Sequence, residues 1–261
     1  MTDVFSYTKG HAPLLVSVPH DGRQLPDSLR VRMTPAGTGI PDTDWHVAEL
    51  YEFARDLGAS MLVANFSRYV VDLNRPASDD ALYDGQVATG LCPTQTFAGE
   101  NIYSNGAIEA DEMAQRVETY WRPYHEKIEQ EIERMLVEHG VALLWDAHSI
   151  AGVVPRLFDG ELPALNIGSN SGNSCARSVE RAVVEVAGES TYQSVVNGRF
   201  KGGYITRHYG DPDNNVHALQ LEIAQRTYMD ENTRVFNAPL AGRLRETLQQ
   251  MLTEFLRAAT S

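Results

Sequence analysis

Residues 141–149 read Val-Ala-Leu-Leu-Trp-Asp-Ala-His-Ser. The apolar run 141–146 predicts a buried strand, and polar residues at the end of such a strand lie where open α/β sheets usually hold their ligands. Comparable short apolar runs predict further strands at residues 14–19, 61–65, 69–73, 164–167 and 219–223. This sequence therefore favours a fold organised around a sheet.

Apolar residues at helical spacing separate these runs. The expected helices cover residues 47–57, 108–139 with an interruption near Pro123, 177–187 and 240–258. Strands alternating with helices predict an α/β fold, a three-layer sandwich with a mixed, mainly parallel sheet flanked by helices. Residues 76–105 have weak periodicity and predict a long surface excursion, for which a lid is one interpretation. No linker divides the chain, so residues 1–261 are expected to form one catalytic domain.

Composition limits the function classes. The formal net charge of -13 disfavours a nucleic-acid partner or an anionic membrane surface, and an acidic substrate would need cationic groups in its own pocket. Cys92 and Cys175 form no CxxC pair and the N-terminus has no signal-peptide pattern, which favours a cytoplasmic location. No apolar run approaches the roughly 20 residues of a membrane-spanning helix.

Three polar positions follow or flank predicted secondary structure: His20, Asp44 and His148. Two imidazoles and one carboxylate, with a fourth position for water, make the ligand set of a catalytic zinc. Asp146 is a candidate for the outer carboxylate that fixes the tautomer of a histidine ligand. Taken singly, each histidine is more often structural, and Asp44 alone is more often a helix N-cap. His46, His125 and His139 are interpreted as surface or structural residues.

A basic block surrounds the run 69–73. Arg75 is a candidate for binding a substrate carboxylate through two N–H···O bonds, with Asn74 as a neutral donor, and Arg68 for stabilising an oxyanion. The alternative is that these arginines form structural ion pairs with Asp72, Asp79 or Asp80.

An acidic residue, Glu222, lies in the last predicted strand. Alternation along a strand puts Glu222 on one face with Gln220. The functional interpretation of Glu222 is a general base, and the alternative is an acid at a solvated strand end.

The glycine-flanked stretch 202–210 suggests a mobile substrate loop in which Tyr204 and Arg207 contact the substrate, although an ordinary turn has the same pattern.

Five motifs in this order resemble the N-formylglutamate amidohydrolase family. They are Val-Pro-His-Asp-Gly at 18–22, Asp-Thr-Asp-Trp-His at 42–46, Ser-Arg-Tyr-Val-Val-Asp-Leu-Asn-Arg-Pro at 67–76, Asp-Ala-His-Ser at 146–149 and Leu-Gln-Leu-Glu-Ile at 219–223. The resemblance spans about residues 19–231, and the 67–76 block is its most specific part. It implies a zinc-carboxypeptidase type of α/β sandwich, one zinc ion per chain, and hydrolysis of N-formyl-L-glutamate to formate and L-glutamate, the last step of one route of histidine breakdown.

The same resemblance implies a role for each site residue. His20, Asp44 and His148 would bind the zinc, Glu222 would act as base and proton shuttle, Arg68 would lie at the carbonyl, and Asn74 with Arg75 at a substrate carboxylate. No His-x-x-Glu follows His20, where Arg23 stands instead, so the carboxylate ligand comes from a later loop and Asp42 competes with Asp44. Arg207 is the candidate for the second carboxylate.

Two rival functions remain open. One keeps the zinc and changes the substrate to another N-acyl amino acid or a short peptide. The other is a non-enzymatic binding module for an acidic metabolite, with structural histidines. The sequence leaves the oligomeric state undetermined.

Overall fold

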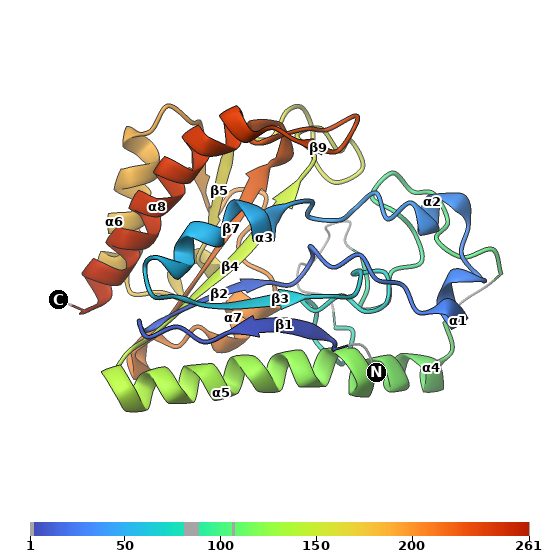
Figure 1. Ribbon diagram of the computed structural model, residues 1–261, viewed down its shortest axis with the longest axis horizontal. Helices are drawn as coiled ribbons and strands as arrows, with labels where there is room; N and C mark the ends of the chain where they lie inside the picture. The colour runs from blue at the N-terminus through green and yellow to red at the C-terminus, as the bar shows by residue number, and fades with distance from the viewer. Residues whose placement is uncertain (1–2, 81–88, 106–107, 261) are drawn as a thin grey trace.

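The computed structural model describes residues 3–80, 89–105 and 108–260, and its centre is a seven-stranded sheet (Figure 1). The strand order is β1-β3-β2-β4-β7-β5-β6. The bounds are β1 Phe5–Thr8, β2 Leu14–Val18, β3 Ser60–Ala64, β4 Ala142–Ile150, β5 Leu165–Gly168, β6 Ser194–Val196 and β7 Val216–Ala224. The pairs β1–β3 and β5–β7 are antiparallel and the other neighbouring pairs are parallel. The predicted mixed, mainly parallel sheet is confirmed.

Helices cover both faces of the sheet. Figure 1 shows α6 and α8 side by side over one face and α5 along the opposite face, which confirms the predicted three layers. The bounds are α1 Asp27–Arg30, α2 Pro35–Thr38, α3 Val47–Leu50, α4 Ala110–Arg116, α5 Arg122–His139, α6 Arg177–Glu189, α7 Tyr204–Tyr209 and α8 Ala238–Thr260. A two-stranded sheet, β8 Met229–Asp230 with β9 Val235–Phe236, precedes α8. No described helix is both long and apolar enough to cross a lipid bilayer.

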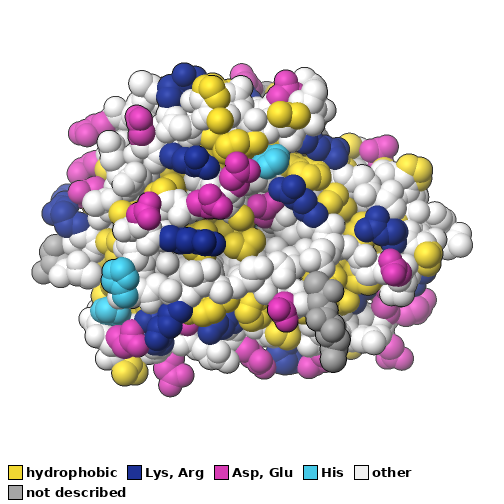
Figure 2. Space-filling model, viewed as in Figure 1, with side chains coloured by type: hydrophobic (Ala, Val, Ile, Leu, Met, Phe, Trp, Pro, Cys, Tyr) yellow, Lys and Arg dark blue, Asp and Glu magenta, His cyan; other side chains and the backbone are white. Residues whose placement is uncertain are grey.

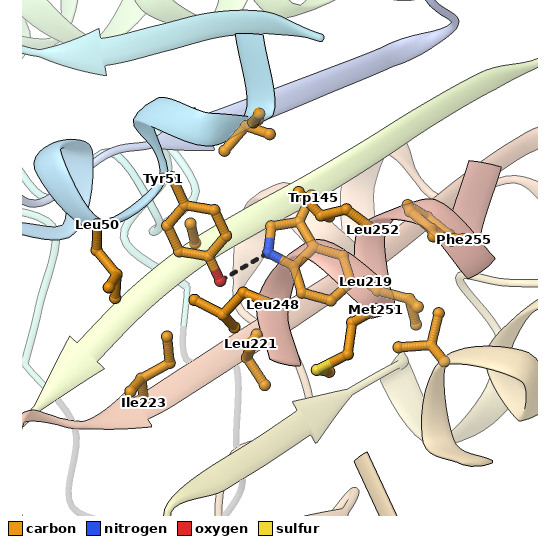
Figure 3. Close-up of a cluster of buried hydrophobic side chains, with 14 of the residues drawn as sticks. Leu50, Tyr51, Trp145, Leu219, Leu221, Ile223, Leu248, Met251, Leu252 and Phe255 are labelled. Carbon is orange, nitrogen blue, oxygen red and sulfur yellow. Dashed lines mark hydrogen bonds between the residues drawn. The ribbon is translucent and has the colours of Figure 1, made fainter. Parts of the chain in front are cut away.

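The central strand β4 divides the core by alternation. Trp145 is fully buried in the cluster that packs beneath α6 and α8, and its indole N–H donates to the hydroxyl of Tyr51 at 3.0 Å (Figure 3). Leu144 points the other way, into the cluster beneath α5. Because successive side chains of a strand face opposite sides, Asp146 and His148 share the face of Leu144. Asp146 and His148 therefore lie on the α5 and α7 side of the sheet.

Two sequence predictions of secondary structure are wrong. Residues 69–73 form turns and irregular backbone instead of a strand. Their apolar character is explained by burial, since Val70 belongs to the buried cluster that includes Ile102, and Val71 to the cluster that includes Leu91. The expected helix 47–57 is broken into α3 and a 3₁₀ turn, Glu52–Arg55.

The long helical segment before β4 behaves as predicted near Pro123. A π-helical turn, Val117–Trp121, joins α4 to α5, and Pro123 lies two residues after it. The change of hydrogen-bond pattern in this turn accommodates a residue that has no N–H to donate. Gly140, with a φ of 74°, ends α5.

The surface carries charges of both signs. Figure 2 shows basic and acidic side chains interspersed over the face that includes α6 and α8. On this face the net charge of -13 is thus not gathered into one continuous acidic patch.

Candidate active site

The site lies at the carboxyl ends of three neighbouring parallel strands. His20 follows β2 by two residues, His148 lies near the end of β4, and Glu222 lies directly opposite His148 in the β4–β7 register. Because parallel strands end at the same edge of the sheet, residues that are far apart in the chain converge there. The predicted grouping of Glu222 and Gln220 on one face holds, since both line the same cavity as His148.

Three buried side chains form a possible metal site. One ligand atom from each of His20, Asp44 and His148 lies within 4.8 Å of the others. Nδ1 of His148 is 3.0 Å and Nδ1 of His20 is 3.8 Å from Oδ2 of Asp44. Among the described residues, Nδ1 of His20 has no hydrogen-bond partner although it is buried. Such an orphaned nitrogen, facing a carboxylate and a second imidazole, fits a divalent ion.

The structure brings Asp44, and not its competitor Asp42, to the two imidazoles. Oδ2 of Asp42 instead accepts hydrogen bonds from the Tyr69 hydroxyl at 2.6 Å and the Phe97 backbone N–H at 2.8 Å. The alternative of Asp44 as a helix cap is also excluded, because the N–H of Ala48 in α3 donates to Asp21. Asp44 is therefore left to face the histidines.

A second carboxylate holds the far nitrogen of each histidine. Nε2 of His20 lies 2.7 Å from Oδ1 of Asp72, and Nε2 of His148 lies 3.0 Å from Oδ2 of Asp146. Such partners orient the ring and leave Nδ1 available as a ligand. Asp146 was expected in this position. The sequence predicts Asp72 only as an ion-pair partner of the arginines, because Asp72 and His20 lie far apart in the chain and their contact leaves no local pattern.

The charges around the two histidines differ. Burial, aided by the positive charge of Arg68, lowers the pKa of His20 and keeps its imidazole neutral. Burial acts in the same direction on His148, but the carboxylates of Asp146 and Asp44 outweigh it and hold its pKa well above the ordinary value. Burial raises the pKa of Glu222 to about 8. The positive charge of His148 acts to lower this pKa, whereas the negative charge of Asp44 raises it further.

Arg68 forms ion pairs of the kind that the sequence analysis gave as the alternative to a substrate contact. One of its terminal nitrogens bonds Oδ2 of Asp72 at 2.6 Å, and the other lies 3.6 Å from Oδ1 of Asp44. These are structural ion pairs, yet the guanidinium also lines the cavity over the site. The proposed contact with a substrate oxygen stays a prediction.

Asn74 is buried and both polar atoms of its side chain are engaged. Its nitrogen donates to Oδ2 of Asp146 at 2.9 Å, and its oxygen accepts from the N–H of Ile205 at 2.8 Å. These bonds give Asn74 a structural role. Asn74 also lines the cavity, and its contact with the substrate stays a prediction.

Two further arginines line the cavity. Arg75 donates through Nε to the Thr89 carbonyl at 2.9 Å, and Arg199 donates through Nε to the Leu157 carbonyl at 2.7 Å. Arg199 was missed because it lies in a stretch without strand or helix periodicity, and its only signal was a positive charge near the 202–210 loop. The site thus contains the local cations that an acidic substrate requires.

The stretch 202–210 contains helix α7 rather than an open loop. The ring of Tyr204 packs against Trp121 and His125, and Nε of Arg207 donates to the Gly202 carbonyl at 2.8 Å. Neither Tyr204 nor Arg207 is among the described residues that line the cavity. Their substrate contacts remain predictions. Residues 76–105 were interpreted as a surface excursion that could act as a lid. Because residues 81–88 of this stretch lie outside the described residues, the lid stays a prediction.

Fold and site together define a class of protein: an α/β protein with a possible His–Asp–His metal site in an arginine-lined cavity at the carboxyl edge of its sheet. Residues 12–229 match the family model described as N-formylglutamate amidohydrolase. The chain belongs to the N-formylglutamate amidohydrolase family.

Individual relatives match over nearly the whole chain. The N-formylglutamate deformylases of Pseudomonas putida and Pseudomonas aeruginosa are each 46% identical over 259 residues, which cover 98% of this chain and 97% of the relative. A crystal structure of N-formylglutamate amidohydrolase from Ralstonia eutropha JMP134 superposes with a TM-score of 0.82 at 24% identity, covering 98% of this chain and 96% of the other. At that identity, the structural match supports the fold alone.

Proposed function

We propose that this chain hydrolyses the amide bond of N-formyl-L-glutamate to give formate and L-glutamate. The observation that carries the proposal is the convergence of His20, Asp44 and His148 beside Glu222, in one cavity that also contains arginines. The 46% identity to two N-formylglutamate deformylases supports the choice of substrate. The whole chain, 1–261, would then serve as one catalytic domain.

Zinc is the proposed ion, one per chain, held by His20, Asp44 and His148. Once bound, it would supply a Lewis acid and lower the pKa of the attacking water toward about 7. Asp72 and Asp146 hold the two imidazole rings in the orientation that such an ion needs.

The protein's own groups manage the proton and the charge. Glu222 takes a proton from the attacking water as the C–O bond forms, and gives it to the departing amine nitrogen as the C–N bond breaks. Arg68 stabilises the negative charge that develops on the carbonyl oxygen. The pKa of Glu222, raised to about 8 by burial, means that the carboxyl group can hold a proton near neutral pH.

Cations of the cavity bind the glutamate part. Arg75 binds one carboxylate, with Asn74 beside it, and the second carboxylate is assigned to Arg207 with Tyr204, or to Arg199, which lines the cavity. A small acidic N-acyl amino acid is thus the expected partner. A place in cytoplasmic histidine degradation, at the step that releases glutamate, is part of the proposal.

The test is formate release from N-formyl-L-glutamate by the purified chain. We expect turnover that a chelator removes and added zinc restores, and higher kcat/KM than with N-acetylglutamate, N-acetylaspartate or a short peptide. Glu222→Gln should lower kcat by about a thousandfold while the metal content, measured by elemental analysis, stays at one ion per chain. A chain that binds glutamate derivatives equally well with and without metal, and releases no formate, would be a binding module instead.

A further inference from the structure

Two cavities meet at the site. The first is the catalytic cavity, and the second has a volume of about 480 Å³ and shares Phe97, Ser149 and Ile150 with it. The walls of the second cavity are mainly apolar and include Pro41, Ala98, Ala151, Val153, Val154 and Pro155. A site for a formylated amino acid has no need of such a space, because the formyl carbon carries only hydrogen.

Phe97 is held firmly at the boundary between the cavities. Its backbone N–H donates to Oδ2 of Asp42 at 2.8 Å, and the turn that carries it is closed by a bond from the N–H of Gly99 to the Thr96 carbonyl at 2.9 Å. Arg156 donates to the same carbonyl at 2.9 Å. These bonds fix the backbone of the turn from both sides, and with it the point from which the Phe97 ring projects.

The Phe97 ring lies against a group that the proposed mechanism uses. The guanidinium carbon of Arg68 is 4.9 Å from the ring centroid, a cation–π arrangement. The ring therefore stands next to the place where Arg68 would meet the carbonyl oxygen of the substrate.

The position of the Phe97 ring limits the size of the acyl group that the substrate can carry; this step rests on the proposed function. A trigonal carbonyl carbon has three substituents. The oxygen lies toward Arg68 and the amine with its glutamate part toward Arg75 and Arg199, which leaves the third substituent on the side of Phe97 and the shared wall. A hydrogen would fit against this shared wall, whereas an alkyl chain would have to cross the wall formed by Phe97, Ser149 and Ile150 to reach the second cavity.

We propose that Phe97 is the specificity-determining residue that restricts the acyl group to formyl, by closing the catalytic cavity from the adjoining apolar cavity. With the ring removed, the chemical class accepted becomes N-acyl-L-glutamates with linear alkyl chains. Each methylene group that enters an apolar space contributes about fourfold in binding, so the gain grows with chain length.

The experiment compares wild type with Phe97→Ala on N-formyl-, N-acetyl-, N-butanoyl- and N-hexanoyl-L-glutamate, with zinc present. The expected result is a rise of at least about tenfold in the ratio of kcat/KM for the hexanoyl to that for the formyl substrate. The ratio cancels any general loss from removing the ring beside Arg68. Ala151→Leu added to Phe97→Ala fills the second cavity and should reverse the gain.

Phe53→Ala is the matched control, since Phe53 is half-buried like Phe97 but lines neither cavity, and it should leave the ratio unchanged. A ratio within twofold of wild type in both Phe97→Ala and Phe97→Leu overturns the inference, as does a wild type that already hydrolyses the hexanoyl substrate as well as the formyl one. Phe97→Leu keeps the test decisive if the alanine variant does not fold. Failure of the proposed function is distinct, because the wild type would then release no formate at all.

Discussion

The side-chain nitrogen of Asn74 lies 2.8 Å from Nε2 of His148, and the two nitrogens lie 2.9 Å and 3.0 Å from the same oxygen, Oδ2 of Asp146. This triangle fixes the ring of His148 from the side opposite Asp44. Through its carbonyl oxygen, Asn74 also accepts from the N–H of Ile205 and so links the site to helix α7. The two segments that flank the catalytic cavity are thereby joined by one buried amide.

Replacement of Asn74 should weaken metal binding. In Asn74→Ala, Asp146 loses the hydrogen bond from the Asn74 amide and the ring of His148 loses a neighbour that constrains it, so we expect about 10- to 100-fold lower zinc affinity. Competition with a fluorescent chelator measures this without reference to turnover. Asn173→Ala, at an exposed asparagine, should leave the affinity at the wild-type value, and an equal loss in both variants would contradict the prediction.

A substitution at Gly203 tests the role of the Asn74 side-chain amide without changing Asn74 itself. A Cβ at residue 203 would lie 2.4 Å from Nδ2 of Asn74, so Gly203→Ala must displace the amide. We expect lower zinc affinity and a lower melting temperature. Gly242→Ala is the control, because no neighbouring atom of the described residues lies within 4 Å of a Cβ there, and in the second turn of α8 this change should stabilise the protein by about 0.5–1 kcal/mol. Gly203→Ala with wild-type affinity would show that the amide tolerates displacement.

Two arginines, Arg199 and Arg207, are candidates for binding the second carboxylate of the substrate. Arg199 lines the catalytic cavity and Arg207 does not, so Arg199→Ala should raise KM for N-formylglutamate by about tenfold or more, while Arg207→Ala should change it little. N-formylglutamine, which lacks the side-chain carboxylate, should respond less to Arg199→Ala. The reverse pattern of KM values would assign the carboxylate to Arg207, the residue expected from the sequence.

His125 makes stability depend on pH. Its Nδ1 lies 2.9 Å from the Tyr209 hydroxyl and its Nε2 2.9 Å from the Leu73 carbonyl; burial, with a smaller contribution from the nearby His208, lowers its pKa to about 3. The folded state therefore binds the proton more weakly than the unfolded state. This stabilisation is complete above about pH 6.5 and is lost as the pH falls from there toward 3.

Urea unfolding of the metal-free chain measures this effect. His125→Gln should be less stable than wild type at pH 7.5, and the difference should shrink by about 2 kcal/mol at pH 5, because only the wild type must take up a proton on unfolding there. Other titrating groups affect both proteins alike. A difference that stays constant between the two pH values would show that His125 does not titrate in this range.

Much of the fold followed from local patterns. The spacing of apolar residues located five of the seven strands of the main sheet, β2, β3, β4, β5 and β7. It did not locate β1 and β6, which are short strands at the sheet edges with half-exposed residues. The amphipathic patterns of α5, α6 and α8 were also sufficient, since each helix buries one face. The run 69–73 misled because burial in irregular backbone and burial in a strand leave the same apolar signature.

The sequence by itself determined which chemical groups are available: two histidines at strand ends, an acid before a predicted helix, an acid within an apolar strand, and a block of arginines. Only the tertiary structure decided which of them meet. It placed Asp44, rather than Asp42, beside His20. It also placed Asp72 within hydrogen-bond distance of His20, and Asn74 within hydrogen-bond distance of Asp146. The physical reason is that apolar spacing reports the burial of each segment, whereas a distance of 3 Å between side chains depends on the register and packing of segments many residues apart.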